Sequence, residues 1–212
     1  MFYWIVRPLL KLFYKLIYPT KIFGLENVVQ DGKRIVICNH LGKMDVFVVG
    51  ALFKNKTYFL SKIEWWDNKL LGWVISKLGA IPLDRDKPSI STIKNAFKVL
   101  KDEKRLAIFP EGRRNFETND LQEIKQGTSM FAVKGQAPIT TVIIHDRLKP
   151  FRKNYAIVGK SFDFSEFYEQ KYTDEVSDKC TEIIANNMKE LQIELAKLVE
   201  EEKSKKKSKK KK

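Results

Sequence analysis

The chain has 212 residues, of which 43% are hydrophobic and 31% are charged. This length and composition fit one folded domain, and they exclude both a pair of large domains and a wholly disordered chain. The two cysteines, Cys38 and Cys180, are too few for a disulfide framework, so we expect a reducing compartment.

The net charge of +14 is concentrated at the two ends of the chain. Residues 203–212 contain eight lysines, residues 1–21 contain four basic residues, and neither segment contains an acid, which leaves +2 for residues 22–202. A nucleic-acid-binding domain usually spreads its basic residues over a folded face, so we expect no specific nucleic acid partner. Basic ends on a nearly neutral body favour an anionic membrane surface.

The first predicted element is an amphipathic helix within residues 1–21, regular from about Pro8 to Tyr18. Its basic residues recur every four positions and form one stripe, Arg7, Lys11 and Lys15. The remaining residues are mostly aliphatic or aromatic, which is typical of a helix lying in the membrane interface with its lysines toward the headgroups. The alternative is an ordinary helix packed on the domain core. Because these charges interrupt the apolar run, we expect neither a transmembrane span nor a signal peptide.

The body of the chain, residues 22–202, alternates predicted strands and helices. The expected strands are 33–38, 57–60, 80–83, 105–109, 139–144 and 155–159. The expected helices are 44–53, 68–78, 89–102, 126–135 and 173–202. This alternation predicts a single α/β domain with a largely parallel central sheet flanked by helices. Residues 203–212 are expected to be an unstructured polylysine tail, because like charges repel and nothing apolar is available to bury.

Four unusual sequences occur at or beside the ends of predicted strands. They are N-H-L-G-K-M-D at 39–45, G-A-I-P-L-D-R at 79–85, F-P-E-G-R-R-N at 109–115 and A-P-I-T-T-V-I at 137–143. In folds of this class, ligands bind at the carboxyl ends of the strands. We therefore expect the functional site at that edge of the sheet.

His40 and Asp45 are the candidates for acid–base chemistry. On one continuous helix a five-residue offset would point them 140° apart, but a turn through Gly42 can bring them together. A carboxylate bound to one imidazole nitrogen leaves the other nitrogen free to take a proton. The alternative is a histidine with a purely structural role. A metal site is not expected, since only one other histidine exists, and a thiol nucleophile at Cys38 is conceivable but less common than a buried cysteine.

Two turns carry residues suited to an anionic ligand. Arg85 follows the third predicted strand, and Glu111, Gly112, Arg113 and Arg114 follow the fourth. Glycine permits close approach of a ligand to the backbone, and arginines offer paired donors to an oxyanion. Each turn alone could be an ordinary charged loop. Together with a candidate base at the same sheet edge, they predict a phosphorylated substrate, and the lack of a Walker sequence argues against a nucleoside triphosphate.

The four motifs, in this order, resemble the conserved blocks of the glycerolipid acyltransferases, most closely the branch that acylates lysophosphatidate. The resemblance rests on N-H-x-x-x-x-D, G-x-I-P-x-D-R, F-P-E-G-x-R and P-I-x-x-V and covers nearly the whole chain. It implies that His40 is the general base and Asp45 its orienting partner. It also implies that the glycerol phosphate is bound by Arg85, Glu111, Gly112 and Arg114.

The resemblance further implies transfer of an acyl group from an acyl-carrier-protein or coenzyme A thioester to the free sn-2 hydroxyl of lysophosphatidate. No other cofactor and no metal are expected, and the enzyme would act as a peripheral protein on the cytoplasmic face of a membrane. The third block departs from the common pattern at Arg113 and Asn115, which leaves the acceptor open. Glycerol-3-phosphate or another lysophospholipid is an alternative acceptor. A hydrolase using Cys38 and His40, or a non-catalytic membrane- or nucleic-acid-binding protein, are alternative functions.

Overall fold

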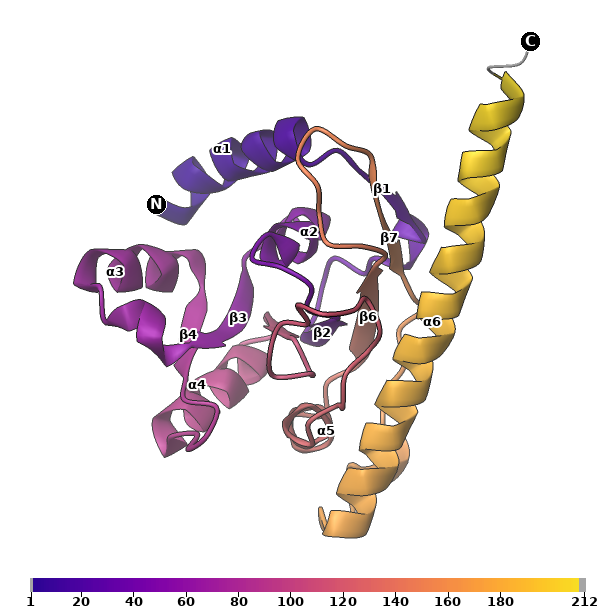
Figure 1. Ribbon diagram of the computed structural model, residues 1–212. Coiled ribbons are helices and arrows are strands. Elements are labelled where there is room, and N and C mark those ends of the chain that lie inside the picture. Colours follow the sequence, from indigo (N-terminus) through magenta and orange to yellow (C-terminus); the bar gives the residue numbers. More distant parts are fainter. Residues whose placement is uncertain (1, 210–212) are drawn as a thin grey trace.

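The computed structural model describes residues 2–209 and places them in one domain around a seven-stranded sheet (Figure 1). The strands are β1 (Thr20–Phe23), β2 (Arg34–Cys38), β3 (Thr57–Lys62), β4 (Ala80–Leu83), β5 (Arg105–Ile108), β6 (Ile139–Ile144) and β7 (Asn154–Val158). The α-helices are α1 (Phe2–Ile17), α2 (Asp45–Leu52), α3 (Lys69–Leu78), α4 (Ile90–Lys101), α5 (Gly127–Lys134) and α6 (Asp174–Lys209). Short 3₁₀ turns are η1 (Leu25–Asn27), η2 (Ile63–Trp66) and η3 (Ser165–Phe167).

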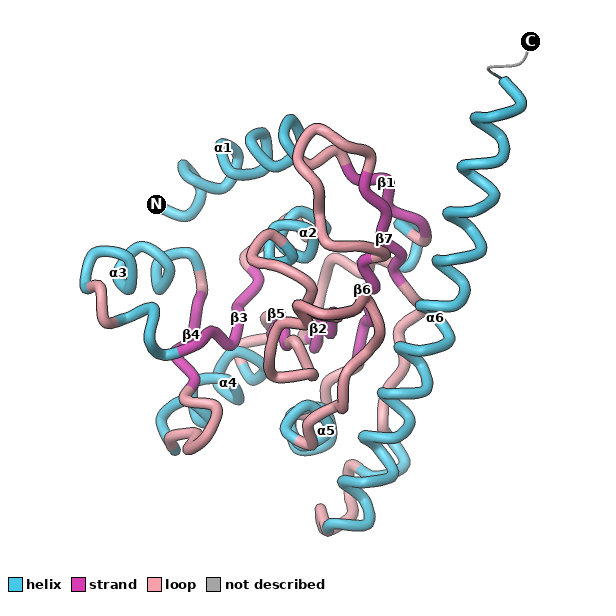
Figure 2. The backbone as a smooth tube through the Cα atoms, in the orientation of Figure 1, coloured by secondary structure: helices cyan, strands magenta, loops and turns pink. Residues whose placement is uncertain are grey.

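The strand order across the sheet is β1-β7-β6-β2-β5-β3-β4. Neighbouring strands are parallel except β6 and β7, so β1 and β7 run against the other five. Helices cover both faces of the sheet, with α1 and α2 on one side and α4, α5 and α6 on the other (Figure 2). The predicted fold class, a single α/β domain with a largely parallel sheet, is confirmed.

The central strand β2 divides the hydrophobic core into two layers. Successive side chains of a strand point to opposite faces, so Ile35 and Ile37 pack toward α4, α5 and α6, whereas Val36 and Cys38 pack toward α1 and α2. All five residues of β2 are buried, as expected for a parallel strand covered on both faces. The carboxyl end of β2 therefore lies at the middle of one sheet edge.

All six predicted strands and the five predicted body helices are present, with bounds shifted by a few residues or, at the end of α6, by seven. The strand β1 was not predicted. It has four half-buried residues and pairs in parallel with β7, more than 130 positions later in the chain. Thr20 and Lys21, expected to belong to the N-terminal segment 1–21, are therefore part of the sheet.

The helix α1 begins at Phe2, earlier than the predicted start near Pro8. Pro8 lies inside the helix. An internal proline removes one backbone hydrogen bond and normally disfavours a helix. Contacts with the rest of the domain hold the first turns in place. The Phe2 ring lies 5.4 Å from the Trp73 ring, and Arg7 donates to the carbonyl oxygen of Phe53 at 2.5 Å.

The prediction of an unstructured tail from residue 203 is wrong for residues 203–209, which continue α6. No glycine or proline interrupts α6, and its last turns are rich in Lys and Glu, which favour helix. Lysines near a helix carboxyl end also interact favourably with the helix dipole. The remaining residues of the predicted tail, 210–212, lie outside the described part of the chain.

Candidate active site

His40 and Asp45 meet at the carboxyl end of β2, as the sequence predicts. The side chain of Asn39 bonds to the backbone nitrogen and oxygen of Ile144, at 2.8 and 2.9 Å, and so extends the contact between β2 and β6 beyond the last ladder pair. The chain then turns at Gly42, and α2 begins at Asp45. The turn places the Asp45 Oδ2 atom 2.9 Å from His40 Nδ1.

The carboxylate of Asp45 is fixed from three directions. Its Oδ2 atom also accepts hydrogen bonds from the backbone nitrogens of Leu41 and Gly42, each at 2.7 Å, and the residue is fully buried. An ionised carboxylate only accepts hydrogen bonds, so this contact favours the His40 tautomer with its proton on Nδ1. The other ring nitrogen, Nε2, is then free to accept a proton from a ligand.

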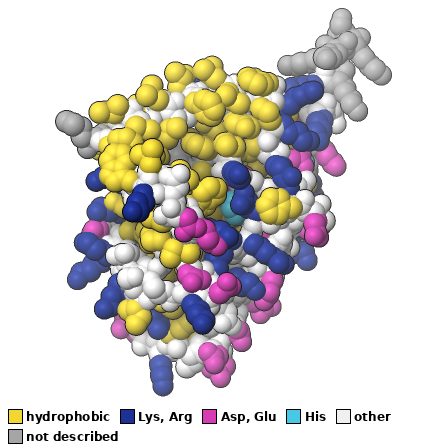
Figure 3. Space-filling model, turned by 60° about the vertical axis from the view of Figure 1, so that its left-hand side comes forward, with side chains coloured by type: hydrophobic (Ala, Val, Ile, Leu, Met, Phe, Trp, Pro, Cys, Tyr) yellow, Lys and Arg dark blue, Asp and Glu magenta, His cyan; other side chains and the backbone are white. Residues whose placement is uncertain are grey.

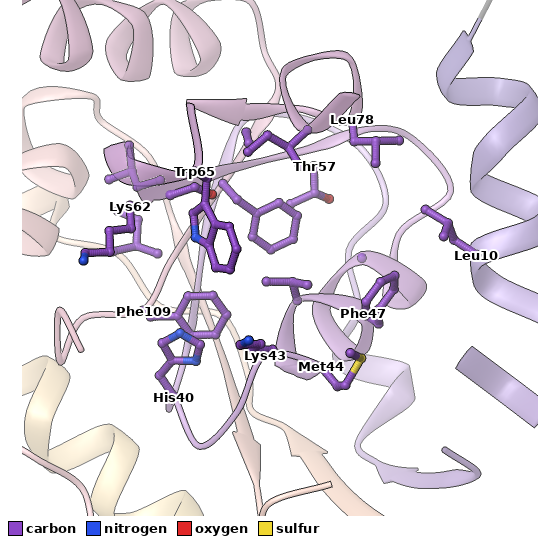
Figure 4. Close-up of a pocket in the computed structure, with 18 of the residues that line it drawn as sticks. Leu10, His40, Lys43, Met44, Phe47, Thr57, Lys62, Trp65, Leu78 and Phe109 are labelled. Carbon is purple, nitrogen blue, oxygen red and sulfur yellow. The ribbon is translucent and has the colours of Figure 1, made fainter. Parts of the chain in front are cut away.

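The imidazole of His40 reaches a cavity of about 580 Å³ (Figure 4). Its ring stacks on Phe109 with a centroid distance of 4.0 Å and an interplanar angle of 19°. Only 8% of His40 is exposed, so the stacking and the Asp45 contact hold the ring in one orientation. The cavity runs between α1, α2, β3 and α3, and most of its wall is apolar, including Leu10, Phe47 and Leu78.

Cationic side chains belong to the wall of the same cavity as His40. Lys62, Arg85, Gly112 and Arg114 belong to its wall, so three of the predicted substrate-binding residues share a cavity with the predicted base. Desolvation lowers the pKa of the Arg85 guanidinium, and the nearby Arg114 lowers it further. Like charges held close together repel, and a bound anion would relieve that repulsion. This wall is therefore suited to a phosphate.

Glu111 has a different position from the one predicted, since it is absent from the cavity wall among the described residues. Its Oε1 atom accepts from the backbone nitrogen of His40 at 2.9 Å, and its Oε2 atom from that of Gln122 at 3.1 Å. The side chain is 2% exposed, and burial raises the pKa of its carboxyl group. Glu111 thus braces the loops beside the site, and the geometry does not support a direct contact with substrate.

The two residues that depart from the common third block also face away from the cavity wall. Arg113 is exposed and donates from Nε to the side-chain oxygen of Gln122 at 2.9 Å. Asn115 is buried, and its side-chain oxygen accepts from the backbone nitrogens of Glu117 and Thr118, both at 3.1 Å. Its backbone nitrogen donates to the carbonyl oxygen of His40 at 2.7 Å. The departure therefore affects the shape of the loop more than the cavity.

Sequence reasoning did not find Arg147, which ties the loops of the site together. Its Nε atom donates to the carbonyl oxygen of Leu41 at 3.0 Å, and its Nη2 atom contacts those of Asn115 and Phe116 at 3.3 and 3.2 Å. The only sequence signal is an arginine three residues after the end of β6. Its partners are backbone oxygens distant in sequence, which no local pattern indicates.

The thiol of Cys38 is not placed to act as a nucleophile. The residue is 1% exposed and packs among apolar side chains on the α2 side of the sheet. Burial raises the pKa of this thiol well above its ordinary value, and the carboxylates of Asp45 and Glu111 raise it further. Since the reactive form is the thiolate, this environment argues against the hydrolase alternative. Within residues 2–209, no three side chains of the metal-binding types come together.

A second feature borders the cavity, a broad exposed apolar surface that we call the apolar face (Figure 3). Its members, all 36% or more exposed, are Trp4, Ile5, Leu9, Leu12, Phe13 and Leu16 on α1 together with Ile63, Trp65, Leu70, Leu71 and Trp73 on η2 and α3. In α1 only Tyr14 is buried. One side of α1 packs on the domain through Tyr14, Phe2 and Arg7, as the alternative of a packed helix expects, while the opposite apolar side is exposed. No helix in the described chain is long and apolar enough to cross a bilayer.

The fold and the site together define an α/β protein with a histidine–aspartate pair at a mostly apolar cavity whose wall also carries cationic side chains. The chain belongs to the Acyltransferase family, whose sequence profile matches residues 20–145. It is 32% identical over 121 residues to the 1-acyl-sn-glycerol-3-phosphate acyltransferase of Bacillus subtilis. The aligned residues cover 57% of this chain and 59% of that protein. The enzyme of the same name from Streptococcus pneumoniae is 35% identical over 115 residues, 53% of this chain and 42% of that protein. The chain thus spans about half the length of these relatives.

A solved structure supports the fold. The crystal structure of the 1-acyl-sn-glycerophosphate (LPA) acyltransferase PlsC from Thermotoga maritima superimposes with a TM-score of 0.62 at 23% sequence identity. The match covers 82% of this chain and 72% of the other. At that identity the likeness establishes the shared architecture, including the mostly parallel sheet.

Proposed function

We propose that this protein transfers a fatty acyl group from a thioester to the free sn-2 hydroxyl of lysophosphatidate, giving phosphatidate. The observation that carries the proposal is the His40–Asp45 pair at a cavity whose wall also contains Arg85 and Arg114. The names of the relatives from Bacillus subtilis and Streptococcus pneumoniae point to the same reaction.

In the proposed reaction, His40 is the general base. Its Nε2 atom takes the proton of the acceptor hydroxyl while the hydroxyl oxygen attacks the thioester carbonyl. The new C–O bond forms, the C–S bond breaks, and the departing thiolate takes the proton back from His40. Asp45 is a positioning residue, since it holds the Nδ1–H tautomer at 2.9 Å and its negative charge stabilises the imidazolium. No acyl-enzyme is formed, which agrees with the burial of Cys38.

The acceptor phosphate is assigned to the cationic wall. Arg85 and Arg114 supply guanidinium donors, and Gly112 lets the ligand approach the backbone. Lys62 also belongs to the wall, where it is paired with Glu64 at 2.5 Å. The left-handed conformation of Gly112, with φ of 70°, is one that other residues rarely adopt. Glycerol-3-phosphate or a larger lysophospholipid remains the alternative acceptor, because guanidinium groups bind the phosphate of a monoester or of a diester.

The apolar part of the cavity is assigned to an acyl chain, delivered as an acyl-carrier-protein or coenzyme A thioester. Leu10, Phe47 and Leu78 offer the apolar wall that a hydrocarbon chain requires. We propose the thioester as a co-substrate and no further cofactor or metal.

We further propose that the enzyme works as a peripheral protein on the cytoplasmic face of a membrane, with α1 immersed in the interface. The support is the exposed apolar face beside the cavity, because a lipid acceptor must enter from the bilayer. One detail differs from the expected basic stripe. Arg7 and Lys11 line the cavity, and Arg7 donates a hydrogen bond to the carbonyl oxygen of Phe53. Arg7 is therefore held against the domain and does not point to the headgroups. The proposed catalytic domain begins with β1 at Thr20, two residues before the predicted start at residue 22.

The test is product formation by the purified full chain in detergent micelles. Lysophosphatidate is offered with an acyl-coenzyme A and separately with an acyl-acyl-carrier protein, and the lipids are separated by chromatography. We expect phosphatidate from at least one donor, and glycerol-3-phosphate or lysophosphatidylcholine should compete poorly. Thioester loss that does not depend on any acceptor would contradict acyl transfer, and preference for glycerol-3-phosphate would replace the proposed acceptor.

A further inference from the structure

The last turns of α6 extend past the folded body. The buried residues of this helix, which pack against β6 and β7, end with Leu195 and Val199. From residue 200 to Lys209, no described side chain is buried. Ten helical residues correspond to about 15 Å of length. Figure 1 shows this end of α6 standing clear of the sheet, on the side of the molecule where α1 lies.

The direction of this extension is fixed by Glu202. One carboxylate oxygen lies 2.6 Å from Lys21 Nζ, and the other lies 3.2 Å from Lys153 Nζ. Lys21 is in β1, four residues after α1 ends, and Lys153 directly precedes β7. The double ion pair therefore ties the end of α6 to the part of the sheet that follows α1.

The segment beyond Glu202 is strongly cationic. Residues 203–209 contain five lysines and no acid, and the described side chains Lys203, Lys205 and Lys206 are exposed. Like charges on successive turns destabilise an isolated helix, and an anionic surface removes that penalty. At the same end of the molecule as this segment, α1 exposes its part of the apolar face (Figures 1 and 3).

We propose that residues 203–209 form a rigid cationic arm that binds anionic lipid headgroups while the apolar face is immersed in the same membrane. The proposal rests on the membrane-bound function above and adds a lipid preference and a defined orientation to it. A lipid surface is the partner that offers both an apolar layer and a layer of negative charge. Nucleic acid would neutralise the lysines but would leave the neighbouring apolar side chains in water.

The first experiment measures binding of the full chain to vesicles by flotation. The variant Lys203→Gln/Lys205→Gln/Lys206→Gln is compared with wild type on phosphatidylcholine vesicles and on vesicles that also contain phosphatidylglycerol. We expect the variant to lose roughly fivefold in affinity per lysine on the anionic vesicles, and little on the neutral ones. A matched control, Lys94→Gln/Lys101→Gln/Lys171→Gln, removes the same charge from exposed positions on or near α4 and the start of α6. The proposal is overturned if this control loses as much as the arm variant.

The second experiment separates a rigid arm from a loose tail. Glu201 is exposed, so replacing it removes no buried contact. Glu201→Pro and Glu201→Gln each remove one negative charge, but only the proline interrupts α6. We expect Glu201→Gln to bind anionic vesicles as well as wild type, and Glu201→Pro to bind at least several-fold more weakly. Equal binding of the two variants would show that the lysines act without the helix, and it would refute the arm.

Two readouts keep this inference apart from the proposed function. Turnover in detergent micelles should be the same in wild type and in the arm variant, since residues 203–206 do not line the cavity. If wild type has no turnover but the vesicle results hold, only the proposed reaction fails. If a double-stranded oligonucleotide binds wild type more tightly than anionic vesicles do, and the arm variant loses that binding, the lipid assignment is wrong.

Discussion

Asp45 decides which nitrogen of His40 can take a proton. Its Oδ2 atom collects hydrogen bonds from His40 Nδ1 and from two backbone nitrogens, so the carboxylate cannot turn away. In Asp45→Asn the shape is kept, but the negative charge that stabilises the imidazolium is lost. We expect kcat to fall roughly 10³-fold or more, with a much smaller change in KM.

A matched control for this variant exists at the other histidine. His145 Nδ1 lies 2.7 Å from Asp146 Oδ2, a pair of the same kind that does not line the cavity. Asp146→Asn should leave steady-state turnover unchanged. Equal losses in Asp45→Asn and Asp146→Asn would mean that Asp45 has no special relation to the chemistry.

Adjacent arginines allow a second comparison at the residue scale. Arg114 lines the cavity, whereas Arg113 is exposed and bonded to Gln122. A charge-assisted hydrogen bond to phosphate contributes about 1.5–3 kcal/mol, so Arg114→Ala should lower kcat/KM for lysophosphatidate by roughly 10- to 100-fold. Arg113→Ala should lower it less than about twofold. Initial rates over a range of acceptor concentrations check this, and a larger loss in Arg113→Ala would contradict the assigned wall.

Among the elements, α1 exposes apolar side chains on the side that faces away from the domain, and only its Tyr14 is buried. Leu9 is 63% exposed at the middle of the helix. Leu9→Glu places a charge where we expect the lipid, so binding to neutral phosphatidylcholine vesicles should fall at least about tenfold. Turnover in micelles should change little, because Leu9 does not line the cavity.

The control for Leu9→Glu is Ile90→Glu at the start of α4. Ile90 is 73% exposed, so the substitution makes the same kind of change on a different element. It should not alter vesicle binding. If both variants bind as wild type does, α1 is not the docking element.

The elements also show what a single sequence can and cannot indicate. The helices and the parallel strands follow from hydrophobic pattern, and the four motifs place His40, Asp45, Arg85 and Arg114 at one sheet edge. The strand β1 could not be predicted, because it is short and its partner β7 is distant in sequence. Pattern alone also does not tell which of two adjacent arginines faces a cavity.

The role predicted for Glu111 shows a related ambiguity. A carboxylate in a motif is equally able to bind a substrate hydroxyl or a backbone N–H, and here both of its oxygens accept from backbone. The end of α6 was predicted to be unstructured because its lysines repel one another. The sequence does not show that Glu202 forms ion pairs with Lys21 and Lys153, which hold this end of the helix against the sheet.

At the scale of the whole molecule, both cysteines are enclosed by the fold. Burial raises the pKa of Cys180 to about 11 and that of Cys38 well above its ordinary value. We expect neither thiol to react with Ellman's reagent at pH 8 in the folded protein, and both to react once denaturant is added. Rapid reaction of Cys38 in the folded state would reopen the hydrolase alternative.

The raised thiol pKa values also set a direction for stability against pH. An acid whose pKa is higher in the folded state favours folding while it is protonated. For Cys180 the contribution is complete below the unfolded thiol value of about 8.5 and is lost as pH rises through about 11. Denaturant midpoints measured from pH 8 to 10.5 should therefore fall less steeply in Cys180→Ala than in wild type.

The role of His40 as general base is tested by single-turnover acyl transfer to lysophosphatidate with wild type, His40→Ala and His145→Ala. General-base catalysis is typically worth about 10²–10⁴ in rate. We predict that His40→Ala loses at least a hundredfold in phosphatidate formation while circular dichroism shows an intact fold. His145→Ala should keep the wild-type rate. Phosphatidate formed by His40→Ala at a near wild-type rate would contradict the proposed mechanism.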